Sequence, residues 1–132
     1  MKIGITVWQN RISPLLDSAS MLLIAEIKNG TIVGSHYEMF HSEVLSSKAL
    51  KIYTMGVKVV ICGAISYFLA NIIESYGIRI IPFVAGDVNQ VLDTYLKGNL
   101  PTPKFQMPGC RIRRQRRFRS AHSLRKDRKS VV

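Results

Sequence analysis

Short apolar runs rich in β-branched residues alternate with amphipathic segments through the first hundred residues of this chain. The apolar runs occupy residues 2–8, 21–27, 31–40, 57–62 and 78–84, and each has the length and composition of a β-strand. The amphipathic segments begin at Ser42, Ser66 and Asp87 and end before Gly56, Gly77 and Gly98. Polar caps and terminal glycines of this kind are typical of helices. The alternation predicts the element order βββαβαβα.

The connections between the predicted strands indicate how the sheet is built. Asn29-Gly30 lies between the second and third runs, and this dipeptide between apolar runs is a strong signal for a β-hairpin. The two later strand–helix–strand passages need crossovers, which imply parallel pairing. Residues 9–20 hold Pro14, Asp17 and three serines and are predicted to form a polar loop. We therefore expect an α/β protein in which three helices pack on a five-stranded mixed sheet.

Charge is distributed unevenly along the 132 residues, whose net charge is +11. Residues 1–104 carry nine basic and seven acidic groups, whereas residues 105–132 carry ten basic groups and one acidic group. We predict an α/β domain at 1–104 and a basic tail at 105–132 that is disordered when free. The arginine-rich stretch at 111–129 either holds nucleic acid or an acidic protein electrostatically or is a solvated terminus.

Several protein classes are excluded by composition and motifs. Two cysteines cannot form a disulfide framework or a four-cysteine metal site. The first residues lack a secretion signal, and the longest apolar stretch, at 59–70, is too short to span a bilayer. We therefore expect a cytoplasmic protein with reduced thiols and no membrane contact. No HExxH, GxSxG, GxGxxG or P-loop motif occurs, so no enzymatic activity is expected.

The predicted ligand crevice lies beyond the carboxyl ends of the parallel strands, as in other open α/β sheets. Gly63 and Gly86 would let the backbone approach a ligand closely. The helix N-termini at Ser66 and Asp87 would offer N–H donors to an anion, and Arg11 would add positive charge. The alternative is that these are ordinary tight turns, in which Asp87 caps its own helix.

Three side chains are candidate ligands for a soft metal. Cys62 ends a predicted buried strand, where packing alone explains a cysteine, but a thiol near helix N-termini would have a lowered pKa and could bind a metal. Cys110 directly precedes the arginine-rich stretch, which also favours the thiolate. His41 precedes the predicted cap of the first helix and could face the crevice, although a lone histidine is more often a surface residue.

Four segments together resemble the dinitrogenase iron–molybdenum cofactor biosynthesis family, which includes NifX- and NafY-type proteins and the C-terminal domain of NifB. These segments are RISPLLDSA from Arg11, ICGAIS from Ile61, IIPFVAGDV from Ile80 and MPGC from Met107. The resemblance covers about residues 1–110. It implies a ribonuclease H-like α/β fold that binds or carries an anionic iron–molybdenum or iron–sulfur cluster without catalysis.

The resemblance and the crevice argument together identify the residues expected at the cluster site. The expected cluster-binding positions are Arg11, Ser13, Gly63, Ala64, Ser66, Gly86 and Asp87. Cys62, Cys110 and His41 are the expected metal ligands. The implied partners are cluster donor or acceptor proteins. The alternative function is a regulatory or nucleic-acid-binding module that acts through the arginine-rich tail.

Overall fold

The computed structural model describes residues 1–100 and 102–107. Within these residues the chain forms six strands and three α-helices. The strands are β1 (Lys2–Trp8), β2 (Arg11–Ile12), β3 (Met21–Lys28), β4 (Thr31–Met39), β5 (Val57–Ile61) and β6 (Arg79–Ile81). The helices are α1 (Leu45–Thr54), α2 (Tyr67–Ser75) and α3 (Val88–Leu96), and short 3₁₀ turns lie at Leu16–Ser18 and Pro103–Phe105. Cys110 and the arginine-rich stretch at 111–129 lie outside the described residues.

The sheet is mixed, as predicted, with the strand order β4-β3-β1-β5-β6. β1, β5 and β6 run parallel to one another, whereas β3 pairs antiparallel with both β1 and β4. The predicted hairpin turn is confirmed, because Asn29 and Gly30 link β3 to β4 with φ values of 54° and 77°. The parallel arrangement brings the carboxyl ends of β1, β5 and β6 to one edge of the sheet.

The prediction of five strands is wrong, because a sixth strand lies within the segment expected to be a loop. β2 pairs antiparallel with the end of β1, placing Arg11 opposite Trp8 and Ile12 opposite Val7. The turn between them holds Gln9 at φ 51° and Asn10 at φ 64°. Two positive φ values are typical of a type I′ hairpin turn, and glutamine is an unusual residue there. The sequence therefore carried only a weak signal for this hairpin.

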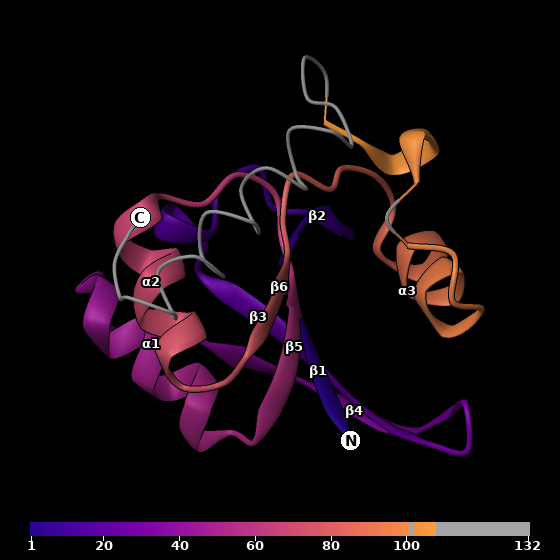
Figure 1. The fold of residues 1–132 in the computed structure, drawn as a ribbon, viewed down its shortest axis with the longest axis horizontal. Helices are drawn as coiled ribbons and strands as arrows, with labels where there is room; N and C mark the ends of the chain where they lie inside the picture. Colours follow the sequence, from indigo (N-terminus) through magenta and orange to yellow (C-terminus); the bar gives the residue numbers. More distant parts are fainter. Residues whose placement is uncertain (101, 108–132) are drawn as a thin grey trace, which may run out of the picture.

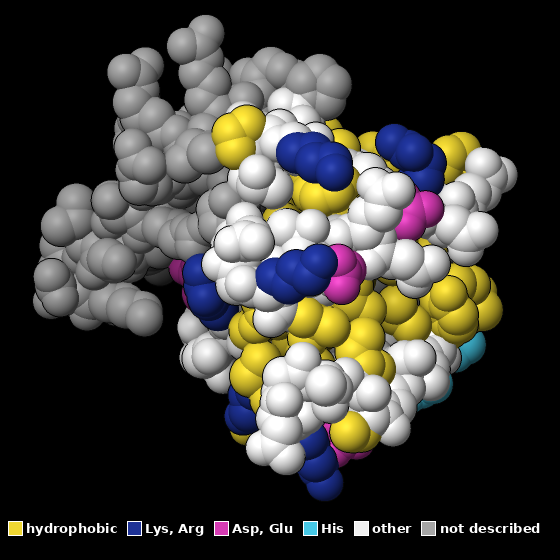
Figure 2. Space-filling model, turned by 90° about the vertical axis from the view of Figure 1, so that its right-hand side faces the viewer, with side chains coloured by type: hydrophobic (Ala, Val, Ile, Leu, Met, Phe, Trp, Pro, Cys, Tyr) yellow, Lys and Arg dark blue, Asp and Glu magenta, His cyan; other side chains and the backbone are white. Residues whose placement is uncertain are grey.

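Two hydrophobic cores lie on opposite faces of the sheet. α1 and α2 cover one face and α3 covers part of the other (Figure 1). Alternate residues of β1, such as Ile3 and Ile5, point to the α3 face, as the two-residue period of a strand requires. On β4, Tyr37 pairs with Leu23 of that face but remains exposed. Seen from the α3 side, hydrophobic side chains are accordingly exposed among polar ones (Figure 2).

The helix termini agree with the sequence at α2 and α3 and differ at α1. Ser66 accepts a hydrogen bond from the N–H of Leu69, and Asp87 caps α3, as predicted. α1 begins at Leu45 rather than at Ser42, and its N-cap residue, Val44, has no side-chain cap. The Ser42 hydroxyl instead accepts a hydrogen bond from the N–H of Val44. None of the helices in the described residues is long and apolar enough to cross a membrane.

The segment after α3 returns to the body and packs against it. Phe105 is only 6% exposed and lies in the core on the α3 face. Its carbonyl accepts a hydrogen bond from the N–H of Ala85, and the N–H of Met107 donates to the carbonyl of Phe83. The basic tail was predicted to begin at residue 105, whereas the buried ring of Phe105 and these two backbone hydrogen bonds hold residues 105–107 on the body. The packed unit therefore extends to Met107.

Replacing Phe105 with alanine is expected to destabilise the protein by about 3–5 kcal/mol, because a large buried ring is lost. The matched control is Phe68→Ala, because that ring is 62% exposed. The control is expected to change the free energy of unfolding by less than about 0.5 kcal/mol. Urea denaturation of both variants checks this, and equal stabilities would contradict the placement of Phe105.

Removing residues 108–132 is expected to leave the thermal unfolding of the body nearly unchanged, because the two cores found among residues 1–100 and 102–107 are kept whole. Truncation after Leu100, which also removes Phe105, is expected to lower the melting temperature clearly. Calorimetry of the two truncated chains beside the full chain separates these outcomes. A large loss of stability in the longer truncated chain would mean that the tail packs on the body.

Candidate functional site

The turns that follow β1, β5 and β6 meet at the carboxyl edge of the sheet. The N–H of Ala64 donates to the carbonyl of Pro14 at 2.8 Å, and the N–H of Leu16 donates to the carbonyl of Ala64 at 2.9 Å. The N–H of Ile12 donates to the carbonyl of Gly86 at 2.9 Å, which joins the first turn to the third. Backbone hydrogen bonds therefore join these three turns to one another.

Gly63 lies where two backbones touch. A Cβ atom at this position would be 2.5 Å from the Pro14 carbonyl oxygen and 2.6 Å from that of Ser13. These distances are shorter than real Cβ contacts, and backbone atoms cannot move aside cheaply. The absence of a side chain at Gly63 thus serves packing between two turns of the chain. Gly63 was predicted to let the backbone approach a ligand, whereas its backbone approaches the turn at Ser13 and Pro14.

Gly86 and Asp87 form the turn into α3 and also serve the fold. A Cβ atom on Gly86 would lie 2.8 Å from Cδ1 of Phe105, and the φ of Gly86 is 132°, which favours glycine. The Asp87 carboxylate accepts hydrogen bonds from the N–H groups of Asn89 and Gln90 at 2.9 and 3.1 Å. Asp87 is therefore a helix cap, which is the alternative that the sequence left open.

The N-terminus of α2 already holds an anion supplied by the chain itself. The N–H of Ser66 donates to a carboxylate oxygen of Asp17 at 3.0 Å, and the Ser66 hydroxyl accepts from Leu69 at 3.2 Å. A carboxylate at the positive end of a helix is favourable. The predicted donor at Ser66 is therefore used within the fold, and Asp17 was not among the predicted site residues.

Cys62 is fully buried in the core between the sheet and helices α1 and α2. Burial raises the pKa of its thiol, and the nearby Asp17 carboxylate raises that pKa further. The expectation of a lowered pKa is wrong, because desolvation of the thiolate outweighs the effect of helix N-termini at this position. A protonated thiol without solvent access is a poor metal ligand.

His41 lies just after β4, which runs parallel to β1, and so it reaches the same edge of the sheet. It lines a hollow of about 180 Å³ together with Phe40, Ser42 and Ser47. Within the part of the chain that the structure describes, no three His, Cys, Asp or Glu side chains are placed to hold a metal ion together. Cys110, the remaining predicted ligand, lies outside that part.

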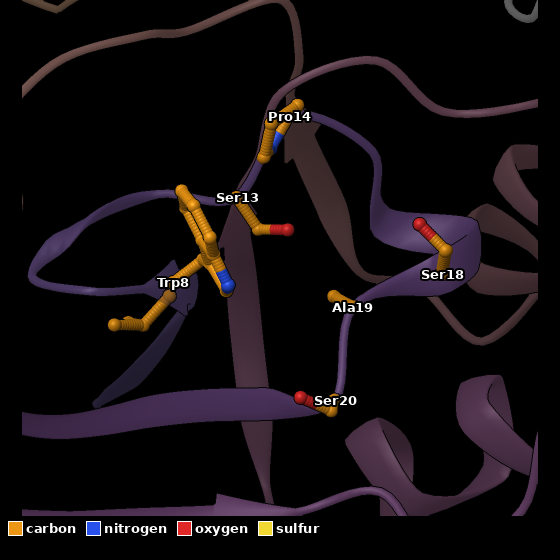
Figure 3. A pocket seen from close by; sticks show the side chains of 7 residues that line it. Trp8, Ser13, Pro14, Ser18, Ala19 and Ser20 are labelled. Atoms are coloured by element: carbon orange, nitrogen blue, oxygen red, sulfur yellow. The ribbon is translucent and has the colours of Figure 1, made fainter.

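A larger hollow of about 280 Å³ lies between the end of β1 and the segment that leads into β3. Its lining residues are Val7, Trp8, Ser13, Pro14, Ser18, Ala19 and Ser20. In Figure 3 the Ser13 hydroxyl and the indole nitrogen of Trp8 face the space that Ser18 and Ser20 close from the other side. Among residues 1–100 and 102–107, the lining thus supplies hydroxyl and indole donors and contains no carboxylate. Of the predicted residues that lie in these ranges, only Ser13 contributes to it.

Lys48 on α1 is the main residue at this edge that the sequence argument missed. Its side chain is 3% exposed, and its ammonium donates to the carbonyls of Asp17 at 2.6 Å and Ala19 at 2.8 Å. Burial lowers the pKa of Lys48, against the opposing effect of the Asp17 and Glu43 carboxylates. A lysine in helical register with Ala49 and Ile52 on the inner face of α1 was the available signal.

Substituting Gly63 with alanine is expected to destabilise the protein by about 1–3 kcal/mol, because an added methyl group collides with backbone oxygens. Gly34→Ala is the matched control, since a Cβ atom at that exposed strand position meets nothing within 4 Å. The control is expected to be as stable as the wild type or slightly more stable. Chemical denaturation of both variants measures the difference, and a neutral Gly63→Ala would refute the contact.

The Cys62 thiol is expected to resist modification in the folded protein. In a Cys110→Ser background, Cys62 is the only thiol, because the chain has two cysteines. It should react with a disulfide reagent at pH 8 only after unfolding, because the reactive thiolate is suppressed. Rapid reaction of the folded variant would show that the thiol is accessible and would restore Cys62 as a candidate ligand.

Comparison with known proteins identifies the fold and the family. The structure of PH0822 has a TM-score of 0.73 at 17% identity, covering 78% of this chain and 95% of that chain. A candidate dinitrogenase from Methanocaldococcus jannaschii, MJ0327, has a TM-score of 0.63 at 21% identity, covering 75% and 90%. The apo form of the orange protein from Desulfovibrio gigas has a TM-score of 0.64 at 16% identity, covering 80% and 94%. At these identities the likeness shows the fold alone.

The family is shown by the sequence itself. No curated protein matches the chain. A family model described as dinitrogenase iron–molybdenum cofactor matches residues 1–98, which include three of the four segments on which the resemblance was based. The chain therefore belongs to the dinitrogenase iron–molybdenum cofactor family.

Proposed function

We propose that this protein binds and carries an anionic metal–sulfur cluster, of the iron–molybdenum or iron–sulfur type, in the hollow beside Trp8. Membership of the dinitrogenase iron–molybdenum cofactor family supports this class of cargo. The observation that supports the place is the lining of the hollow, in which hydroxyl and indole donors face inward and the described residues include no carboxylate. Neutral donors suit an anion, because they stabilise it without the desolvation of a buried cation.

Positive charge lies beside the hollow rather than inside it. Arg11 is exposed and stands directly opposite Trp8 across the β1–β2 pair, so the two side chains are on the same face of that ribbon. An exposed guanidinium at this place would attract an anionic cluster and would then lie at the rim of the hollow. The volume of about 280 Å³ is near the lower limit of ligand pockets, about 300 Å³. The cargo would therefore remain partly exposed.

The protein ligand to the cluster, if there is one, is proposed to be His41 or Cys110. His41 is exposed and reaches the same edge of the sheet. Cys62 is not part of the proposed site, because its thiol is buried and protonated. Of the other predicted positions, Gly63, Ala64, Ser66, Gly86 and Asp87 are proposed to shape the edge of the sheet rather than to touch the cargo.

A carrier role in the cytoplasm, without catalysis, is part of the same proposal. A shallow site with exposed cargo allows transfer from a donor protein and onward to an acceptor protein. The ribonuclease H-like classification of the fold also remains a proposal. The arginine-rich stretch at 111–129 lies outside the described residues, and none of the comparisons supports nucleic-acid binding.

Anaerobic titration with an isolated iron–molybdenum or iron–sulfur cluster tests the proposal. Trp8 is the only tryptophan in the chain, so its fluorescence reports on the hollow alone. Binding is expected to be near stoichiometric and to quench this fluorescence. Bound metal is measured independently after desalting. If the wild type retains no cluster and its emission does not change, the proposed function is wrong.

Ser13→Ala is expected to weaken binding about tenfold or more, because a hydrogen bond to a charged group is worth roughly 1.5–3 kcal/mol. The control is Ser75→Ala, whose hydroxyl donates only to the carbonyl of Ile72 at the far end of α2. Ser75→Ala should bind like the wild type. Full affinity in Ser13→Ala, with binding intact in the wild type, would place the cluster elsewhere.

A further inference from the structure

The chain at residues 16–20 separates two hollows at the carboxyl edge of the sheet. One is the hollow of about 280 Å³ beside Trp8 and Ser13. The other, of about 120 Å³, is lined by Phe40, Ser42, Glu43 and Lys48. Ser18, Ala19 and Ser20 line both. The 16–20 segment is therefore a wall only one chain thick, with the proposed cargo site on one side and Lys48 on the other.

The side chain of Lys48 binds the backbone of this wall. Its ammonium donates to the carbonyls of Asp17 at 2.6 Å, Ala19 at 2.8 Å and Leu16 at 3.5 Å. It also lies 5.3 Å from the centre of the Phe40 ring. A buried lysine is usually paired with a carboxylate. Here the Asp17 carboxylate accepts from the N–H of Ser66, and the ammonium of Lys48 donates to backbone carbonyls of the wall.

The hydrogen bonds of Lys48 fix the path of the residues that also line the hollow beside Trp8. Ala19, whose carbonyl accepts from the ammonium at 2.8 Å, lines both hollows, and so do its neighbours Ser18 and Ser20. In a trans peptide the N–H points opposite to the carbonyl of the preceding residue. The bond from Lys48 to the Ala19 carbonyl therefore sets the orientation of the whole peptide that joins Ala19 to Ser20.

We propose that Lys48 is a positioning residue for the cluster site, which rests on the function proposed above. By binding the carbonyls of the 16–20 segment on one side, Lys48 holds Ser18, Ala19 and Ser20 where they line the hollow on the other side. The hydroxyls of Ser18 and Ser20 are thereby kept at the rim of that hollow. Lys48 thus positions donors for the anion without touching the anion.

The first arm of the test measures the wall without cargo. Lys48→Met removes the three hydrogen bonds and keeps the apolar stem of the side chain. Amide exchange of residues 16–20 is expected to rise at least tenfold in this variant. Lys51→Met is the matched control, because Lys51 lies on the same helix but pairs with Glu38 at 3.4 Å. Unchanged exchange in Lys48→Met would overturn the proposal.

The second arm measures cluster affinity in the same variants. Lys48→Met is expected to bind at least tenfold more weakly than the wild type, Lys51→Met is expected to be unaffected, and Lys48→Arg, which keeps cationic donors, is expected to recover most of the affinity. Equal affinity of Lys48→Met and the wild type would refute the positioning role and leave the proposed function standing. If the wild type itself binds no cluster, the proposed function fails, and the positioning role fails with it.

A third variant covers the case in which Lys48→Met does not fold. Lys48→Gln retains an amide donor that can serve some of the three carbonyls. In Lys48→Gln, amide exchange at residues 16–20 is expected to be faster than in the wild type. Its cluster affinity is expected to be lower than that of the wild type. Wild-type values in both measurements would contradict the proposal.

Discussion

Close contact between two turns at Gly63 is the constraint on which the rest of this edge depends. The carbonyls of Ser13 and Pro14 lie where a side chain at Gly63 would be, and the N–H of Ala64 donates to Pro14. This contact fixes the segment after β2 over the end of β5. Beyond this contact, the Asp17 carboxylate lies at the N-terminus of α2, and the backbone carbonyl of Asp17 points toward Lys48. The hollow beside Trp8 is the space that remains in front of this segment.

The resulting site differs in its chemistry from a helix-dipole anion site. At α2 the N–H of Ser66 donates to Asp17, and at α3 the N–H groups of Asn89 and Gln90 donate to Asp87. The donors proposed for a ligand are instead serine hydroxyls and an indole. Such donors are neutral, and the nearby cations lie outside the hollow at Arg11 and behind it at Lys48. This arrangement suits a cargo that must be held and then released.

Much of the fold was predictable because it is encoded locally. The hairpin at Asn29-Gly30, the parallel strands and the caps at Ser66 and Asp87 each follow from a few neighbouring residues, and the structure confirms them. The parts that were missed depend on contacts between distant segments. Nothing near Gly63 in the sequence shows that Pro14 will touch it, and nothing near Phe105 shows that it returns to Gly86. Lys48 was visible as a lysine in an apolar register, but its three carbonyl partners lie about thirty residues away along the chain.

The central claim is that an anionic cluster binds between the end of β1 and residues 13–20. Nuclear magnetic resonance of the protein loaded with an iron cluster that has unpaired electrons tests it directly, because such a centre broadens nearby amide signals. Selective loss of the amide signals of Trp8, Ser13 and residues 18–20, with the β3–β4 turn at Asn29 and Gly30 unaffected, is the predicted result. Broadening centred instead on α3, with the signals of Trp8, Ser13 and residues 18–20 retained, would contradict the account.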